Sequence, residues 1–247
     1  MSFTSVVHAE WLKISSLRSS WVALASVFLA TLGFSLLMSA TFTPQDLAAP
    51  AFDPLRSAFY GLNFGGLGVI SLGAMAVAAE YKTGAIRISL AVVPRRGLLC
   101  AAKLTVVGAL TFAVGLVTSV ICFVVGQSFF GDKAVGLFTA DGTRAVLGVA
   151  LYYTLIGLFA AGLAFLLRSA VAVLSILIPL LMMVSFVVGD ISEEGGFADF
   201  LPDRAGQQIV LQDPAGPLGP WTGLAVLALW AGAALAAGAA RLVRKDA

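Results

Sequence analysis

The fold is decided by residues 145–189, which read AVLGVALYYTLIGLFAAGLAFLLRSAVAVLSILIPLLMMVSFVVG. This stretch is apolar almost throughout, and its single charged residue, Arg168, lies near the middle. One transmembrane helix needs about 20 residues, so the stretch has room for two. We therefore expect one span at 145–167, another at 170–189, and a tight turn at Arg168 and Ser169 between them.

The composition of the whole chain is that of a membrane protein. Of its 247 residues, 60% are hydrophobic and 11% are charged, whereas a soluble domain has about 25% charged residues. These proportions exclude a soluble enzyme, a disordered chain and a nucleic-acid-binding domain. With four further apolar runs, we predict an all-α integral membrane protein with a single transmembrane domain over 21–247. Its six spans are expected at about 21–41, 58–79, 104–126, 145–167, 170–189 and 220–240.

The distribution of charge gives the orientation. If the N-terminus is cytoplasmic, the inner segments hold eleven of the fifteen Lys and Arg residues but only three of the thirteen Asp and Glu residues. Cytoplasmic loops of membrane proteins carry this excess of positive charge. Treating 145–189 as one span would place Arg241, Arg244 and Lys245 outside, against the pattern. We expect six spans with both termini in the cytoplasm.

Several classes of chemistry lack their residues in this chain. No Asp, Glu, Lys, Arg or His lies inside any of the six runs, which disfavours ion-coupled transporters and intramembrane metalloproteases or aspartyl proteases. His8 is the single histidine, and Cys100 and Cys122 lack C-x-x-C spacing, so we expect no metal site and no catalytic residue. A phosphate-binding G-x-x-x-x-G-K-[ST] loop is also absent, so the chain is not expected to bind ATP or to be an enzyme.

Residues 1–20 are predicted to form an amphipathic helix on the inner membrane surface. Glu10 falls on its apolar side and needs a partner, which Lys13 or another subunit could supply. The helix is either a plain membrane-surface element or a contact for another protein. Its apolar sector comprises Phe3, Val6, Val7, Trp11, Ile14, Leu17 and Trp21.

The inner segment 80–96 reads EYKTGAIRISLAVVPRR. Thr83 is expected to cap a short helix that Pro94 stops. Its apolar side chains share one face and would be poorly buried unless a partner received them, whereas Arg87 points elsewhere. The segment is therefore either an ordinary loop with orienting arginines or a docking element for a cytoplasmic protein. The apolar face comprises Ile86, Leu90 and Val93.

Small residues recur at helical spacing in two of the runs. Gly61 and Gly65 form a G-x-x-x-G pair, and a four-residue repeat runs through 228, 232, 236 and 240, including Gly232 and Ala236. Such faces let helix backbones approach closely. They indicate either packing within one subunit or a face between two subunits.

The order and spacing of these features resemble a known family. The segment after the Gly-rich second run, and the opening Glu10-Trp11-Leu12-Lys13 with Leu17-Arg18-Ser19, are similar to permease subunits of ATP-binding-cassette (ABC) exporters of the type-2 class, including actinobacterial members. The length, the six runs and the long outer segment between the last two also fit this family. The matching positions of the inner segment are Glu80, Gly84, Leu90, Pro94, Arg96 and Lys103.

The resemblance implies a transport role in a bacterial cytoplasmic membrane. A separate ATPase would carry ATP and Mg²⁺, two permease units (identical or different) would form the pathway, and no cofactor would bind this chain. Short, partly re-entrant outer helices would join the last two spans, with 197–202 as one such piece. The ATPase would contact a coupling helix between spans two and three and the N-terminal surface helix. The implied coupling positions are Glu80, Gly84, Ile86, Arg87, Leu90 and Pro94, and the surface-helix positions are Glu10, Lys13 and Arg18.

Two other functions stay open on the sequence alone. A secondary transporter would move its substrate without nucleotide and would depend on an ion gradient. A membrane scaffold or immunity protein would act without any ATPase partner. In every case the membrane lipid is a partner and nucleic acid is not.

Overall fold

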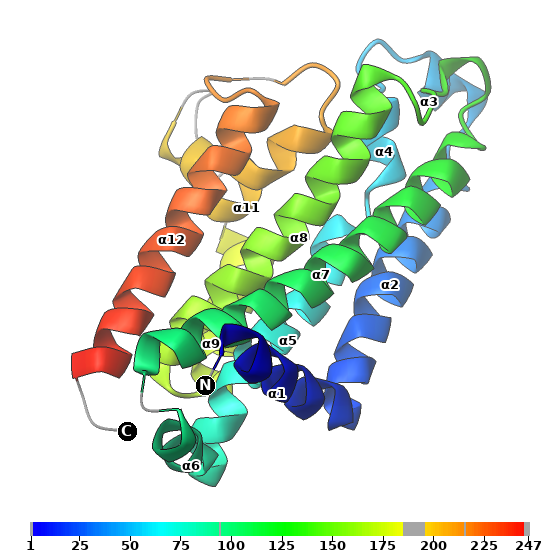
Figure 1. Cartoon of the computed structure of the whole chain (residues 1–247). Helices are drawn as coiled ribbons and strands as arrows, with labels where there is room; N and C mark the ends of the chain where they lie inside the picture. The colour runs from blue at the N-terminus through cyan, green and yellow to red at the C-terminus, as the bar shows by residue number, and fades with distance from the viewer. Residues whose placement is uncertain (1, 94, 185–195, 215, 245–247) are drawn as a thin grey trace.

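The computed structural model describes residues 2–93, 95–184, 196–214 and 216–244, and within these ranges the ordered elements are all helical (Figure 1). The elements are α1 Phe3–Ser16, α2 Arg18–Ser39, α3 Pro44–Ala48, α4 Pro54–Ala58, α5 Leu62–Thr83, α6 Ala85–Val92, α7 Arg96–Gln127, η1 Gly131–Lys133, α8 Ala140–Leu167, α9 Ala170–Pro179, η2 Leu180–Val184, η3 Phe197–Phe200, α11 Pro202–Gln207, η4 Gln208–Val210 and α12 Pro220–Arg244.

Five of these helices, α2, α5, α7, α8 and α12, are long and apolar enough to cross a membrane. The prediction of an all-α, multi-pass membrane protein is confirmed to that extent. The predicted span 170–189 corresponds to a shorter apolar helix, Ala170–Met182, and its last residues, 185–189, lie outside the described residues. Five of the six expected spans therefore correspond to helices that are long and apolar enough to cross a membrane.

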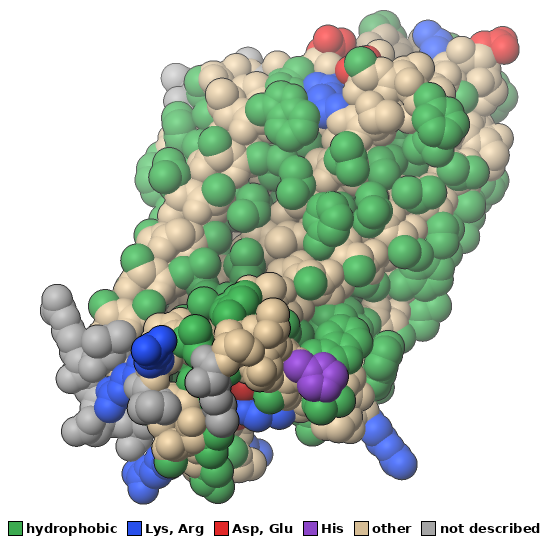
Figure 2. Space-filling model, in the orientation of Figure 1, with side chains coloured by type: hydrophobic (Ala, Val, Ile, Leu, Met, Phe, Trp, Pro, Cys, Tyr) green, Lys and Arg blue, Asp and Glu red, His purple; other side chains and the backbone are tan. Residues whose placement is uncertain are grey.

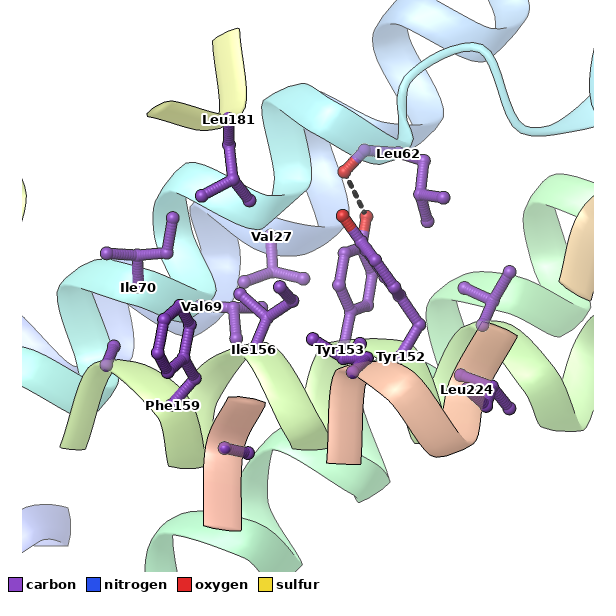
Figure 3. Packing of buried hydrophobic residues seen from close by; sticks show 14 of the residues in the cluster. Val27, Leu62, Val69, Ile70, Tyr152, Tyr153, Ile156, Phe159, Leu181 and Leu224 are labelled. Atoms are coloured by element: carbon purple, nitrogen blue, oxygen red, sulfur yellow. Dashed lines mark hydrogen bonds between the residues drawn. The ribbon is translucent and has the colours of Figure 1, made fainter. Parts of the chain in front are cut away.

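The core of the bundle forms around α8, which packs against α5, α7 and α12. Tyr152, Tyr153 and Ile156 of α8 are fully buried. The Tyr153 hydroxyl donates to the carbonyl of Leu62 at 3.0 Å (Figure 3) and lies 2.7 Å from Oγ1 of Thr31. Because buried hydroxyls need hydrogen-bond partners, these two contacts fix α2 and α5 against α8.

The predicted turn at Arg168 and Ser169 is confirmed. Arg168 adopts the left-handed conformation with φ 57° and ends α8, and its N–H donates to the carbonyl of Ala164. The Ser169 side chain accepts from the N–H of Ala172 and so caps α9. Left-handed C-caps and serine N-caps are the usual means of ending one helix and starting the next within a few residues.

The two predicted small-residue faces have different environments. A Cβ on Gly61 would lie 2.1 Å from the Thr31 carbonyl oxygen, and one on Gly65 would lie 1.9 Å from Thr31 Oγ1. This pair therefore packs α5 onto α2 within one chain. On α12, Gly232 and Ala236 are exposed, and a Cβ on Gly232 would meet nothing within 4 Å.

The charged residues separate to the two ends of the bundle. Arg96 of α7 donates to the Leu242 carbonyl at 2.8 Å, and Arg241 donates to the Leu166 carbonyl. The start of α7 and the ends of α8 and α12 therefore lie together, at the end of the bundle that carries α1 and α6 (Figure 1). Lysine and arginine side chains gather there, whereas hydrophobic side chains cover the side of the bundle (Figure 2). We call this the basic end. Among the described residues, its only acids are Glu10 and Glu80.

The opposite end holds α3, α4 and the segment that precedes α12. Arg144 donates to the Leu211 carbonyl at 3.0 Å, and the N–H of Gln212 donates to Asp53 at 2.8 Å. The short helices η3, α11 and η4 occupy the predicted outer segment. They pack into the bundle, because Ile209 is fully buried against Gly148 of α8.

Candidate functional site

Helix α1 lies across the basic end and is shorter than predicted. It begins after Ser2, whose side chain accepts from the N–H of Ser5, and ends at Ser16, where Leu17 is extended. Arg18 is consequently the first residue of α2, not part of the surface helix. The side of α1 that faces the bundle is formed by Val6, Glu10 and Ile14.

The predicted apolar sector of α1 does not form one buried face. Phe3, Trp11 and Leu17 are all more than 40% exposed, as is Trp21 at the start of α2. Glu10 is the reason, because the helix rotates to bring this carboxylate, 1% exposed, against the bundle. Glu10, which interrupts the apolar sector in the sequence, thus lies at the centre of the contact between α1 and the bundle.

Four charged side chains form a network at this contact, in which Glu10, Glu80 and Lys103 are buried and Lys13 is exposed. Nζ of Lys13 lies 2.6 Å from Oε1 of Glu10 and 2.9 Å from Oε1 of Glu80. Nζ of Lys103 lies 2.9 Å from the same Glu80 oxygen and also pairs with Oε2 of Glu10. Each lysine therefore bridges both glutamates, and the network of two cations and two anions is neutral. We call these four residues the ion network.

The ion network connects three helices, and one hydrogen bond joins it to a fourth, α6. Glu10 and Lys13 belong to α1, Glu80 to the end of α5, and Lys103 to α7. Lys13 also donates to Oγ of Ser89 on α6 at 3.0 Å, and Lys103 donates to the Ala76 carbonyl at 3.2 Å. Lysine has three donors, so both ammonium groups are well satisfied.

The sequence pattern predicts part of this network. Lys13 is a partner of Glu10, as expected. The resemblance includes Lys103 but does not predict its role in the network, where it is 1% exposed and pairs with both glutamates. Glu10 itself indicates such a partner in the sequence, because a carboxylate on a buried helix face favours a buried cation nearby.

The electrostatics of the network favour its charged form. Burial alone disfavours the ammonium form of Lys13, but hydrogen bonds to Glu10 and Glu80 and their negative charges outweigh this, so the pKa of Lys13 is raised above 10.5. A raised folded-state pKa gives stability that is present below the unfolded value and is lost as the pH rises through the folded value.

This gives a testable pH dependence for α1. We expect α1 to stay docked between about pH 7 and 9 and to loosen only above about pH 10.5, as Lys13 loses its proton. Protease cleavage within residues 3–16, followed against pH, measures the docking. In Lys13→Met the alkaline step should be missing; an identical step in the variant would show that Lys13 does not control the docking.

The short helix α6 begins differently from the prediction. Gly84, with φ 72°, ends α5 and is the N-cap of α6, whereas Thr83 donates its hydroxyl to the Ala79 carbonyl and caps nothing. Glycine suits this position because it adopts a left-handed conformation without a Cβ clash. The helix ends at Val92, and the predicted stop, Pro94, lies outside the described residues.

The apolar face of α6 is covered by this chain. Ile86 and Val93 are buried, and they pack with Val6 of α1 and with Leu99 and Ala102 of α7. The expectation that these side chains need an external partner is therefore wrong. Leu90 is half-buried, whereas Arg87 is exposed and Ile88 is 70% exposed. The surface that α6 offers to a partner is formed by Arg87, Ile88 and Val92.

The donor set of the described residues does not suggest a metal centre. Within these ranges no three His, Cys, Asp or Glu side chains come together to hold an ion. Cys100 and Cys122 are free and buried.

No protein-family model and no curated protein matches this chain. The fold and the site thus define a multi-pass helical membrane protein in which α1 is tied to the bundle by buried ion pairs and α6 is joined to α1 by a hydrogen bond.

Proposed function

We propose that this chain is the permease subunit of an ABC exporter of the type-2 class. It would form the translocation pathway with a second permease unit, and separate ATPase subunits would supply the energy. The observation that most supports this is the ion network, which ties the surface helix α1 to the bundle helices α5 and α7 and joins α6 through the hydrogen bond from Lys13 to Ser89.

The network makes these elements suited to move together. Pulling α1 away from the bundle would separate Lys13 from Glu80 and Glu10 from Lys103, and α6 is joined to α1 through the hydrogen bond from Lys13 to Ser89. An uncompensated buried charge is costly, by about 3–5 kcal/mol when one partner is removed. A displacement of α6 is therefore expected to pass to the ends of α5 and α7 instead of being absorbed locally.

This arrangement fits alternating access driven from the basic end. ATP can favour one state of the permease only through contacts that differ between the two states. The exposed side chains of α6, Arg87 and Ile88, are the candidate contacts for an ATPase. Closure of two ATPase subunits would displace α6, and the network would transmit the movement so that the two permease units rock apart.

The finer topology belongs to the same proposal. The excess of positive charge supports a cytoplasmic position for the basic end, and under this proposal the membrane is that of a bacterial cell. The segment 170–189 would be the fifth of six spans, with both chain termini cytoplasmic. The buried position of Ile209 supports short outer helices that dip back toward the membrane.

A photo-crosslinking experiment tests the docking surface. A crosslinking residue at Ile88 should give a covalent adduct with an ATPase in native membranes. The matched control is Phe138, which is 92% exposed at the opposite end of the bundle and should give none. Two results would contradict docking at the basic end. One is an equal yield of ATPase adduct at Ile88 and Phe138, and the other is an ATPase adduct at Phe138 with none at Ile88.

A further inference from the structure

A cavity of about 500 Å³ opens at the basic end, between α6 and the turn that joins α8 to α9. It lies beside the ion network but shares no side chain with it. A Cβ on Gly84 would meet nothing within 4 Å, which leaves this side of the cavity open. The lining residues are Tyr81, Gly84, Ile86, Arg87 and Arg168.

The polar groups of the cavity are hydrogen-bond donors. The Arg168 guanidinium carbon lies 5.3 Å from the centroid of the Tyr81 ring, a cation–π contact that holds this side chain in place. The Tyr81 hydroxyl is buried and has no hydrogen-bond partner among the described residues. A buried hydroxyl in this position favours an acceptor that enters from outside, because leaving it unsatisfied costs free energy.

The local charge balance favours an anion. Both described acids of the basic end, Glu10 and Glu80, are paired with Lys13 and Lys103. Arg87 lines the cavity and pairs with no described acid. Guanidinium groups match the oxygens of phosphate, to which they donate two parallel hydrogen bonds.

The surroundings of the cavity favour an anion that is attached to an apolar body. Ile88 on α6, two residues from the lining residue Ile86, is 70% exposed, and Val171 on α9, three residues after the lining residue Arg168, is 73% exposed. The cavity also lies where the apolar helices α5 and α8 end, which is the expected level of lipid headgroups. Figure 2 shows basic and hydrophobic side chains side by side at this end.

We propose that this cavity binds a phosphate group, with Arg87, Arg168 and the Tyr81 hydroxyl as donors. An acidic phospholipid headgroup and free phosphate are the two sources of this chemistry. The site goes beyond the proposed function, because it requires neither an ATPase nor transport. An occupied site would join α6 to the turn after α8 through the bound phosphate.

The test uses the full chain, purified alone in a neutral detergent, with lipid retention measured by native mass spectrometry. The probes are phosphatidylglycerol, phosphatidylcholine and inorganic phosphate. Arg87→Gln and Tyr81→Phe remove one donor each, and Tyr81→Phe keeps the ring under Arg168. Arg95→Gln is the matched control, because Arg95 is exposed at the same end, does not line the cavity, and carries the same charge.

We expect the wild-type chain to retain phosphatidylglycerol in preference to phosphatidylcholine. Arg87→Gln should lower this retention by about fivefold, because it removes a charge-assisted hydrogen-bond donor of the site; Tyr81→Phe should also lower it, and Arg95→Gln should lower it clearly less than Arg87→Gln. Competition by inorganic phosphate would show that free phosphate also occupies the site, and absence of competition would identify the lipid as the source. Equal losses in Arg87→Gln and Arg95→Gln, or no preference between the lipids, would overturn the proposal.

Discussion

Replacing Lys103 with methionine should strongly destabilise the protein. Lys103 is 1% exposed and pairs with Glu10 and Glu80, so its removal leaves two buried carboxylates with Lys13 as their remaining partner. Breaking a buried ion pair from one side costs about 3–5 kcal/mol. We expect a lower unfolding temperature in detergent and faster protease cleavage within α1, because α1 is the element that the pair holds.

Two controls separate the ion pair from other effects of this substitution. Lys82→Met removes an exposed lysine at the same end and should change the unfolding temperature little. The double variant Glu10→Leu/Lys103→Met removes both buried partners and should recover much of the lost stability, since apolar replacement of a whole buried pair is often nearly neutral. If the double variant is less stable than Lys103→Met, the two residues do not act as a pair.

Replacing Gly65 with alanine should also destabilise the protein, through packing. The added Cβ would lie 1.9 Å from Thr31 Oγ1 and 2.3 Å from the Tyr153 hydroxyl. Because both groups are buried and hydrogen-bonded to each other, α2 and α5 must separate or the contact must break. Overpacking a well-packed core costs about 1–3 kcal/mol, which thermal unfolding in detergent measures.

The neighbouring residue gives a matched control for this prediction. Gly66→Ala adds the same atom one position along α5, where a Cβ would meet nothing within 4 Å. Since alanine favours a helix over glycine by about 1 kcal/mol, this variant should be neutral or more stable. A similar loss in both variants would show that helix propensity or the detergent, and not the contact with Thr31, controls the outcome.

The features that could be predicted from the sequence are those that depend on neighbouring residues. The turn at Arg168 and Ser169 follows from one charged residue between two apolar runs, and the structure confirms it. The long helices follow from apolar runs of sufficient length, although α7 begins at Arg96, several residues before its apolar run. A short amphipathic beginning can continue into a membrane helix without a break in the backbone.

The features that could not be predicted depend on contacts between distant segments. The buried partner of Glu10 is Lys103, and nothing in the local pattern of either segment reveals that α1 lies against α7. The same contact buries Ile86, because Val6 and Leu99 cover the side of α6 that amphipathic periodicity assigns to a partner. The G-x-x-x-G pair is compatible in sequence with packing within one subunit or between two subunits. The position of Thr31 opposite Gly61 and Gly65 shows that the pair packs within one chain.

If an ATPase acts on this membrane protein through the basic end, the two proteins should co-purify. The tagged chain would be isolated in mild detergent from the membranes in which it naturally occurs, and nucleotide hydrolysis by the isolated material would be measured. We predict that an ABC ATPase co-purifies in a fixed ratio and hydrolyses ATP, and that both properties decline in Lys103→Met. Isolation of the chain without any ATPase, from cells in which its transport activity persists, would contradict transport driven by an ATPase.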